Sequence, residues 1–194
     1  MFALITTVIA FILFYIYDYN SVKWRHFIIN KFFGLGSFLL LFSLLFMVFS
    51  QIKEAEIHLF GIISVLFFLI LLVHTLFFAI PFKDTYIKDE QNRLAYTHGV
   101  YALCRHPGVI WLLGLTVSLY YLIPTNQSLL YIGVINILNY VYIVLQDVWT
   151  FPNTFTNYTA YKMETPFLIP NIKSIKMCFL TIHHTPGGLY ESEK

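Results

Sequence analysis

The sequence predicts an all-α, polytopic helical membrane protein. The first observation is composition: 58% of the 194 residues are hydrophobic and only 11% are charged, with a mean hydropathy of +0.71. Soluble domains carry about 25% charged residues. The second is that apolar residues gather in long runs separated by short polar loops. Because unpaired backbone groups cannot face lipid, these runs are expected to be helical.

Five runs are candidates for transmembrane helices, which each need roughly 20 apolar residues. They are Ala3–Tyr17, Phe32–Ser50, Leu59–Ile80, Gly108–Ile123 and Leu129–Val148. The first and fourth are short and would borrow flanking residues. The first run lacks a preceding basic region and an Ala-x-Ala cleavage site, so it is predicted to be a retained span. Residues 1–194 are expected to form one integral membrane domain.

The basic residues predict the orientation of these spans. The loops after the first, third and fifth spans are basic; their residues are Lys23, Arg25, Lys31, Lys83, Lys88, Arg93, Arg105, Lys162, Lys173, Lys176 and Lys194. Residues 51–58 carry one lysine beside two glutamates, and residues 124–128 carry no charge. By the positive-inside rule, the N-terminus is outside and the C-terminus is cytoplasmic. Residues 149–176 are then a cytoplasmic segment, and residues 177–194 are expected to be a loose tail.

Charge and cysteine content argue against several classes of function. The net charge of +2 and the lack of a dense basic cluster argue against a nucleic-acid partner. Cys104 and Cys178 make no disulfide framework and have no metal-ligand spacing. His183 and His184 have no partner at metal spacing, so no metal site is expected. No serine or cysteine has a base at a recognisable spacing, which gives no support for nucleophilic hydrolysis.

The triplet Arg105-His106-Pro107 is the most informative polar feature. It joins a cation, an imidazole and a proline that is suited to the first turn of a helix. The helix N-terminus behind the triplet would offer N–H groups to a carboxylate or phosphate. The short turn at residues 124–128 predicts an antiparallel hairpin, which returns the chain to the cytoplasmic face at Gln146-Asp147. Arg105 as a simple interfacial anchor is the alternative.

Two sequence blocks lie on either side of the predicted membrane hairpin. The first block has Gly99, Tyr101 and Arg105-His106-Pro107, and the second has Tyr158, Tyr161, Thr165-Pro166 and Pro170. In spacing and order these blocks resemble the signature and the C-terminal pattern of the isoprenylcysteine carboxyl methyltransferase and phospholipid methyltransferase superfamily.

This resemblance implies an enzyme that uses S-adenosylmethionine and methylates a lipophilic acceptor from the bilayer, such as an isoprenylcysteine-like carboxylate or a lipid amine. The cytoplasmic C-terminal region would hold the cofactor. The implied cofactor-binding residues are Tyr101, Arg105, His106, Pro107, Gln146, Asp147, Tyr158 and Tyr161. No catalytic residue is assigned, because transfer of a methyl group from a sulfonium depends mainly on positioning and desolvation.

The chain also departs from the superfamily pattern. An aromatic residue and a glycine after Arg-His-Pro are replaced by Val109 and Trp111, and a Glu-Glu pair is replaced by Gln146-Asp147. These changes leave open a non-catalytic membrane or lipid-binding descendant of the same fold. A membrane NADPH-dependent reductase is a further alternative, since steroid-reductase-like proteins resemble this C-terminal layout.

Overall fold

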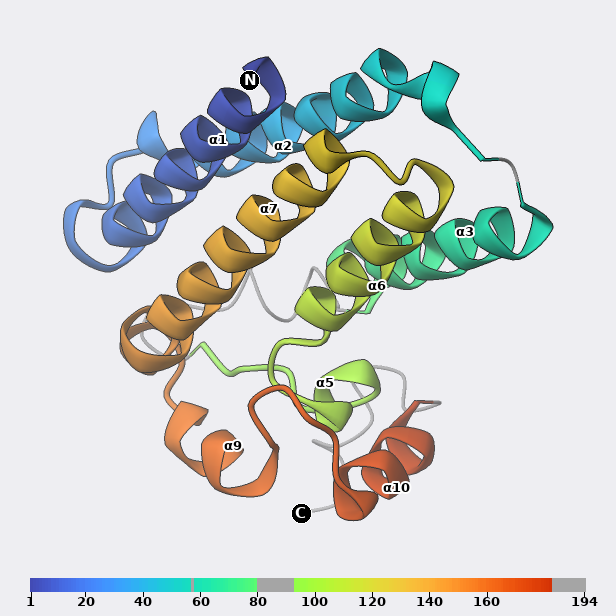
Figure 1. Ribbon diagram of the computed structural model, residues 1–194. Helices are drawn as coiled ribbons and strands as arrows, with labels where there is room; N and C mark the ends of the chain where they lie inside the picture. Colours follow the sequence, from blue (N-terminus) through green and yellow to red (C-terminus); the bar gives the residue numbers. More distant parts are fainter. Residues whose placement is uncertain (57, 80–92, 183–194) are drawn as a thin grey trace. The chain divides into compact units, whose positions relative to one another are not determined.

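A computed structural model describes residues 1–56, 58–79 and 93–182 of the chain, and every regular element in these ranges is helical. The helices before residue 80 are α1 (Phe2–Tyr19), η1 (Asn20–Trp24), η2 (Ile29–Lys31), α2 (Phe32–Ser50), η3 (Ile52–Glu54), α3 (Leu59–Val73) and η4 (His74–Phe78). Those after it are α5 (Val100–Leu103), α6 (Pro107–Leu122), α7 (Asn126–Leu145), η6 (Gln146–Thr150), α8 (Phe151–Thr154), α9 (Tyr158–Glu164) and α10 (Ile172–Thr181), as drawn in Figure 1. The all-α prediction is thus confirmed for the described residues.

Four helical stretches are long and apolar enough to cross a membrane. Within the described ranges they are Phe2–Trp24, Ile29–Ser50, Leu59–Phe78 and Asn126–Thr154. These stretches make the chain a multi-pass membrane protein. The fourth expected span, Gly108–Ile123, corresponds to α6, which is apolar but has only 16 residues. The count of five and the orientation of the termini stay predictions.

The chain divides into two compact units, and the single membrane domain stays a prediction. The first unit comprises Met1–Leu69 and Leu112–Phe151, and the second comprises Ile70–Trp111 and Pro152–Lys194. In the first unit α1 packs against α2 and α7 (Figure 1). In the second unit α5 packs against α10. Each unit has its own set of polar contacts.

The helices of the first unit approach closely where small residues face a neighbour. A Cβ on Gly36 of α2 would lie 2.8 Å from the Phe14 ring and 3.0 Å from the Ala10 carbonyl oxygen of α1. A Cβ on Gly114 of α6 would lie 2.4 Å from the Phe68 ring of α3. In lipid the hydrophobic effect does not drive helices together. Small residues let the helices approach closely enough to be held by van der Waals contact instead.

Short polar side chains join the same helices inside this core. Thr7 of α1, Ser43 of α2 and Tyr131 of α7 form one hydrogen-bonded group, with 2.7 Å between Thr7 Oγ1 and Ser43 Oγ and 3.1 Å between Ser43 Oγ and the Tyr131 hydroxyl. Asn136 Nδ2 of α7 donates to Thr116 Oγ1 of α6 at 2.9 Å. This last contact and the capped turn at Thr125 agree with the predicted hairpin.

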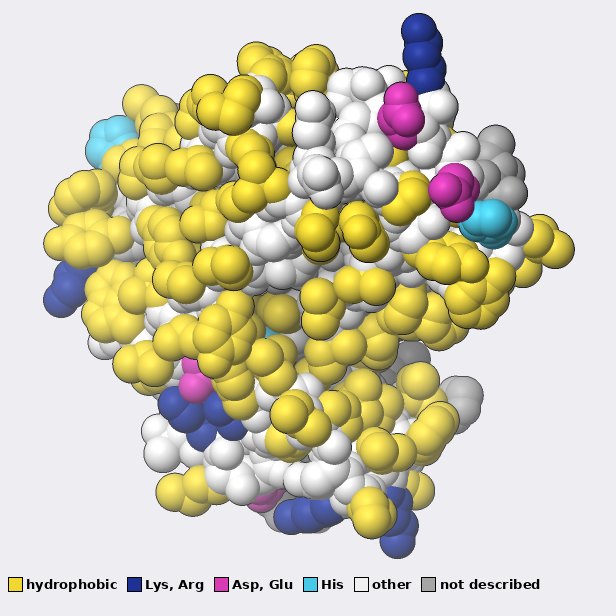
Figure 2. Space-filling view, viewed as in Figure 1, with side chains coloured by type: hydrophobic (Ala, Val, Ile, Leu, Met, Phe, Trp, Pro, Cys, Tyr) yellow, Lys and Arg dark blue, Asp and Glu magenta, His cyan; other side chains and the backbone are white. Residues whose placement is uncertain are grey.

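Large apolar side chains cover the outside of these helices. Phe38, Phe49, Phe60 and Ile70 are each more than 60% exposed. Figure 2 shows hydrophobic side chains over most of the visible face of the long helices. A solvent-facing helix would place polar residues there, so this surface fits lipid.

Three of the spans end in a wide π-helical turn. η1, η4 and η6 follow α1, α3 and α7 directly, and each is five residues long. In η1 the Arg25 N–H donates to the Asn20 carbonyl at 2.7 Å, and in η4 the Ala79 N–H donates to the His74 carbonyl at 2.8 Å. All three turns lie at span ends that the basic residues predict to be cytoplasmic. Such turns often occur at functional positions.

The C-terminal helix extends further than the sequence suggests. α10 continues to Thr181, whereas a loose tail was expected from residue 177. The helix begins at a capping box between Asn171 and Ser174, which satisfies its first N–H groups. It ends where Thr181 Oγ1 accepts a hydrogen bond from the Gly99 N–H at 2.9 Å. Residues 183–194 of the expected tail lie outside the described residues.

Candidate functional site in the second unit

The first sequence block begins at a glycine that the backbone requires. Gly99 has φ +58° and ψ −129°, which a residue with a side chain rarely adopts. It precedes the short helix α5, and its N–H donates to Thr181 of α10. Tyr101 on α5 donates from its hydroxyl to the Thr75 carbonyl of η4 at 3.1 Å. The glycine therefore sets the direction in which Tyr101 leaves the loop.

Arg105 holds the second sequence block. Its Nη1 donates to the Thr165 carbonyl at 2.6 Å and to the Lys162 carbonyl at 3.2 Å. Its backbone N–H donates to the Pro166 carbonyl at 2.9 Å. The guanidinium carbon also lies 5.6 Å from the centre of the Phe167 ring, within cation–π range. One residue thus makes four contacts with residues 162–167.

His106 and Pro107 lie immediately behind this contact. His106 is 6% exposed, and its ring centre is 5.2 Å from that of Phe167 in an edge-to-face arrangement. Pro107 is fully buried and begins α6, which confirms the prediction that it starts a helix. An arginine and a histidine therefore precede the positive end of a 16-residue helix.

The two C-terminal tyrosines are interior residues. Tyr158 is 1% exposed and Tyr161 is 6% exposed, with ring centres 5.8 Å apart. The Tyr161 hydroxyl donates to the Tyr101 carbonyl at 2.6 Å, and burial raises the pKa of Tyr161. Since a buried hydroxyl needs a partner, this bond gives Tyr161 a structural role in joining the two blocks.

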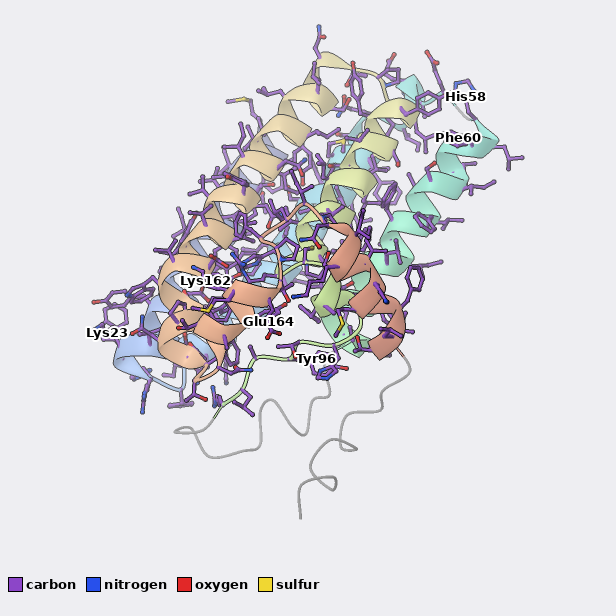
Figure 3. The ribbon with its side chains drawn as sticks, turned by 90° about the horizontal axis from the view of Figure 1, so that it is seen from below. Lys23, His58, Phe60, Tyr96, Lys162 and Glu164 are labelled. Carbon is purple, nitrogen blue, oxygen red and sulfur yellow. The ribbon has the colours of Figure 1, made fainter. Side chains whose placement is uncertain are left out.

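A further clamp joins α9 to the segment that precedes the first block. Asn157 Oδ1 accepts from the Ala95 N–H at 2.7 Å, while its Nδ2 donates to the Ala95 carbonyl at 3.1 Å. The Thr156 N–H donates to the Arg93 carbonyl at 3.0 Å. Figure 3 labels Tyr96 in this segment, and Lys162 and Glu164 on α9. Burial raises the pKa of Tyr96.

Cys104 lies between the motif residues and is sealed from solvent. Its side chain is 0% exposed, and burial raises the pKa of the thiol from its ordinary 9.0 to about 12. The thiol is thus held protonated at neutral pH. Since the thiolate is the nucleophilic form, Cys104 is a packing residue here.

The remaining two predicted residues belong to the first unit. Gln146 and Asp147 open η6, where Gln146 is half-buried and Asp147 is 6% exposed. Gln146 Nε2 donates to the Tyr142 hydroxyl at 2.9 Å. The second unit brings together Tyr101, Arg105, His106, Pro107, Tyr158 and Tyr161.

Asp18 is a polar residue that the sequence analysis missed. It lies on α1, is 2% exposed, and accepts from the Tyr142 hydroxyl and from Thr150 Oγ1, both at 3.1 Å. The expected first span stops at Tyr17, one residue before Asp18, whereas α1 extends to Tyr19. An acidic residue at the end of an apolar run was the available signal, because ionisable groups in spans are costly and often functional.

The hydrogen bonds among Asp18, Tyr142 and Gln146 give a physical reason why position 146 carries an amide, where the superfamily pattern has a glutamate. The Tyr142 hydroxyl has one hydrogen, which it donates to Asp18, so its oxygen is left to accept. The Gln146 amide donates to that oxygen. An ionised glutamate can only accept, and it would also place a second negative charge near Asp18. The amide therefore suits the neighbours of position 146.

Comparisons of the chain with protein-family models, with curated proteins and with solved structures find no match. Three consecutive residues of the second unit nevertheless supply groups of the kind that bind anions: a half-buried arginine, a buried imidazole and a helix N-terminus.

Proposed function

We propose that the protein is a membrane methyltransferase that transfers a methyl group from S-adenosylmethionine to a lipophilic acceptor. One observation carries the proposal. The two sequence blocks that resemble the methyltransferase superfamily, more than 50 residues apart, are hydrogen-bonded to one another through Arg105 and Tyr161. A chance pair of motifs would have no reason to meet in this way.

The reaction would need little covalent help from the protein. A nucleophilic atom of the acceptor attacks the methyl carbon, the sulfur–methyl bond breaks, and S-adenosylhomocysteine leaves. The positive charge of the sulfonium is lost in this step, so orientation and exclusion of water supply most of the acceleration. An apolar acceptor would reach the site from the bilayer, which the exposed apolar helices contact.

The residues take distinct roles in this proposal. His106 and the N–H groups that follow Pro107 bind the carboxylate of the cofactor. Arg105 adds positive charge, and it positions the C-terminal block because its Nη1 already contacts two carbonyl groups. Gln146 and Asp147 belong to the first unit, and the sequence resemblance alone makes them candidates for cofactor binding. Tyr101, Tyr158 and Tyr161 shape the wall of the site.

A non-catalytic membrane protein of the same fold is the second candidate. The observation in its favour is that several motif side chains are engaged inside the chain. Arg105 and Tyr161 bind backbone carbonyls, and Gln146 binds Tyr142. The same contacts would serve a protein that only has to keep its fold.

Binding of S-adenosylmethionine separates the two candidates. The full chain in lipid nanodiscs is titrated by calorimetry with S-adenosylmethionine, S-adenosylhomocysteine and NADPH. The proposal expects heat and a thermal shift with the first two ligands and none with NADPH. No response to S-adenosylmethionine at millimolar concentration would reject the enzyme. A response to NADPH alone would favour a reductase.

A matched pair of histidine variants tests the site. His106→Gln removes the buried imidazole behind Arg105, whereas His58→Gln changes a histidine that is 48% exposed and is labelled in Figure 3. We expect His106→Gln to weaken binding by about tenfold or more, the value of one charge-assisted hydrogen bond. His58→Gln should bind normally. Equal affinity of both variants would show that His106 does not contact the cofactor.

A further inference from the structure

The two faces of α10 are reversed relative to a helix on the surface of a soluble protein. Its buried face carries Ser174, 2% exposed, and Cys178, 8% exposed. Thr181 continues the same face and binds Gly99. These side chains are small, and their spacing of four and three residues places them on one stripe.

The outer face of α10 carries the large apolar side chains. Ile172 is 87% exposed, Ile175 41%, Phe179 71% and Ile182 49%. Their spacing of three, four and three residues also defines one stripe. Burial of large apolar side chains is strongly favourable in water, so a helix in water would turn this stripe inward. The arrangement indicates an apolar environment outside α10.

Positive charge lies beside this stripe. Lys173 and Lys176 are both exposed, and the segment from Thr165 to Ile182 contains no acidic residue. Figure 2 shows Lys or Arg side chains next to hydrophobic ones at the lower right, where Figure 1 places α10. An apolar stripe flanked by lysines is typical of a helix that lies in the interface of a bilayer with anionic lipids.

We propose that the outer face of α10, defined by Ile172, Ile175, Phe179 and Ile182 with Lys173 and Lys176, docks on the anionic headgroup region of the membrane. The second unit also contains residues 70–78 and 107–111, which end one apolar span and begin another apolar helix. The unit is thus attached to the bilayer by its own chain. The apolar stripe enters the acyl boundary, and the two lysines contact lipid phosphates.

Docking of this helix is separate from the proposed enzyme activity. It depends on the exposed face of α10, whereas cofactor binding depends on residues around Arg105. Phe179 and the two lysines make no contact with that cluster in the described hydrogen bonds and ring pairs. A protein that binds no S-adenosylmethionine can therefore still dock, and the two proposals fail independently.

Spin-label accessibility measures the docking directly. Phe179→Cys on α10 is labelled with a nitroxide in the full chain, and Met163→Cys on α9, where Met163 is 84% exposed, is the matched control. The protein is placed in nanodiscs of phosphatidylcholine alone or mixed with phosphatidylglycerol. In the mixed bilayer, the label at 179 should collide more with oxygen than with a nickel chelate. The label at 163 should show the opposite preference.

Two lysine substitutions test the electrostatic part. Each basic residue near an anionic surface favours binding by about fivefold, so Lys173→Gln with Lys176→Gln should lower the ratio of docked to undocked protein about thirtyfold. The same pair should have no effect in pure phosphatidylcholine, and added salt should weaken docking of the unsubstituted protein. Docked and undocked protein are measured as the immobilised and mobile components of the nitroxide spectrum of the label at position 179.

Three results would overturn the proposal. One is a label at 179 that is as accessible to the nickel chelate as the label at 163. Another is equal docking in neutral and anionic bilayers, which would remove the role of the lysines. The third is dipolar broadening between labels at 179 without an oxygen preference, since a second copy of the chain would then cover α10.

Discussion

The two units of the molecule use different kinds of hydrogen bond. In the first unit most hydrogen bonds between distant segments join two side chains: Thr7 with Ser43, Asn136 with Thr116, and Tyr142 with Asp18. In the second unit most of them join a side chain to the backbone, as from Arg105 to Thr165 and from Asn157 to Ala95. Each unit has an exception: Ser43 also donates to the Ala3 carbonyl, and Trp111 donates to the Thr75 hydroxyl. The first unit consists mainly of long helices, whereas the second contains extended and looped segments.

The difference follows from where unsatisfied backbone groups occur. A membrane helix satisfies its own N–H and C=O groups, so its polar side chains are available to join other helices. Loops leave carbonyl and amide groups without helical partners, and long polar side chains must reach them. Arg105, which is expected to bind a cofactor, therefore also holds the backbone of the second unit in place.

The largest expected effect is the difference in thiol reactivity between buried Cys104 and a cysteine on the surface. This difference tests whether the interior of the second unit is closed. A pKa raised from 9.0 to about 12 lowers the thiolate population of Cys104 about a thousandfold at pH 8. We expect a maleimide to leave Cys104 unlabelled until the protein is unfolded in detergent, while a cysteine introduced at exposed Met163 reacts at once. Rapid labelling of Cys104 would show that the unit opens.

The same thiol gives a pH dependence of stability. The folded protein holds the proton more tightly than the unfolded chain, whose thiol ionises near 9. The contribution of Cys104 is therefore fully present below pH 9 and is lost progressively as the pH rises towards about 12. Cys104→Ser should make the fall in stability above pH 9 less steep in unfolding titrations, while the buried tyrosines, whose pKa values burial also raises, keep the rest of the slope.

Arg105→Ala should cause the largest loss of stability. Two hydrogen bonds from a charged donor are worth about 1.5–3 kcal/mol each, and partial exposure reduces the sum to about 3 kcal/mol. Arg105→Lys keeps the charge but not the paired contact, so it should recover less than half of that loss. Unfolding in mixed micelles measures both. A stable Arg105→Ala variant would mean that the blocks meet without this clamp.

Asp18→Ala should have an intermediate effect on the first unit. It leaves the Tyr142 and Thr150 hydroxyls without their acceptor, which costs about 2 kcal/mol. Asp18→Asn keeps an acceptor for Tyr142 and should lose less than half as much. Gln146→Glu should also destabilise, because it introduces a second acceptor beside the Tyr142 oxygen. If Gln146→Glu proves neutral, the explanation given for the amide is wrong.

Ser43→Ala should have the smallest effect. Neutral hydrogen bonds between membrane helices average about 0.6 kcal/mol, and Thr7 and Tyr131 can still bond to one another. We expect a loss of about 1 kcal/mol or less in the same unfolding assay. A loss as large as that of Arg105→Ala would erase the contrast between the two units.

The sequence predicts the apolar helices well because hydropathy is a local property. Phe32–Ser50 is a helix with the expected bounds, and Pro107 begins a helix as its missing N–H suggests. The π-helical turns were not predictable, because a change from one hydrogen-bond register to another leaves hydropathy unchanged. Helix α10 was not predicted because its ten residues include two lysines and are too short an apolar run to indicate a span.

The candidate site was predictable only in part. The resemblance to the superfamily placed Arg105 and Thr165 in two related sequence blocks, and in the structure Arg105 donates a hydrogen bond to the Thr165 carbonyl. Spacing could not show that Tyr158 and Tyr161 are buried, since tyrosine is also common at membrane surfaces. The role of Asp18 was hidden because its partners, Tyr142 and Thr150, are more than 120 residues away.

Cross-linking tests the central claim most directly. The full chain in nanodiscs is irradiated with S-adenosylmethionine that carries a radioactive methyl group, with and without excess S-adenosylhomocysteine, and the labelled peptides are identified. The proposed function predicts a displaceable label on peptides that contain residues 99–111 or 158–166, and its loss in His106→Gln but not in His58→Gln. No displaceable label, or a label confined to other peptides, would contradict it.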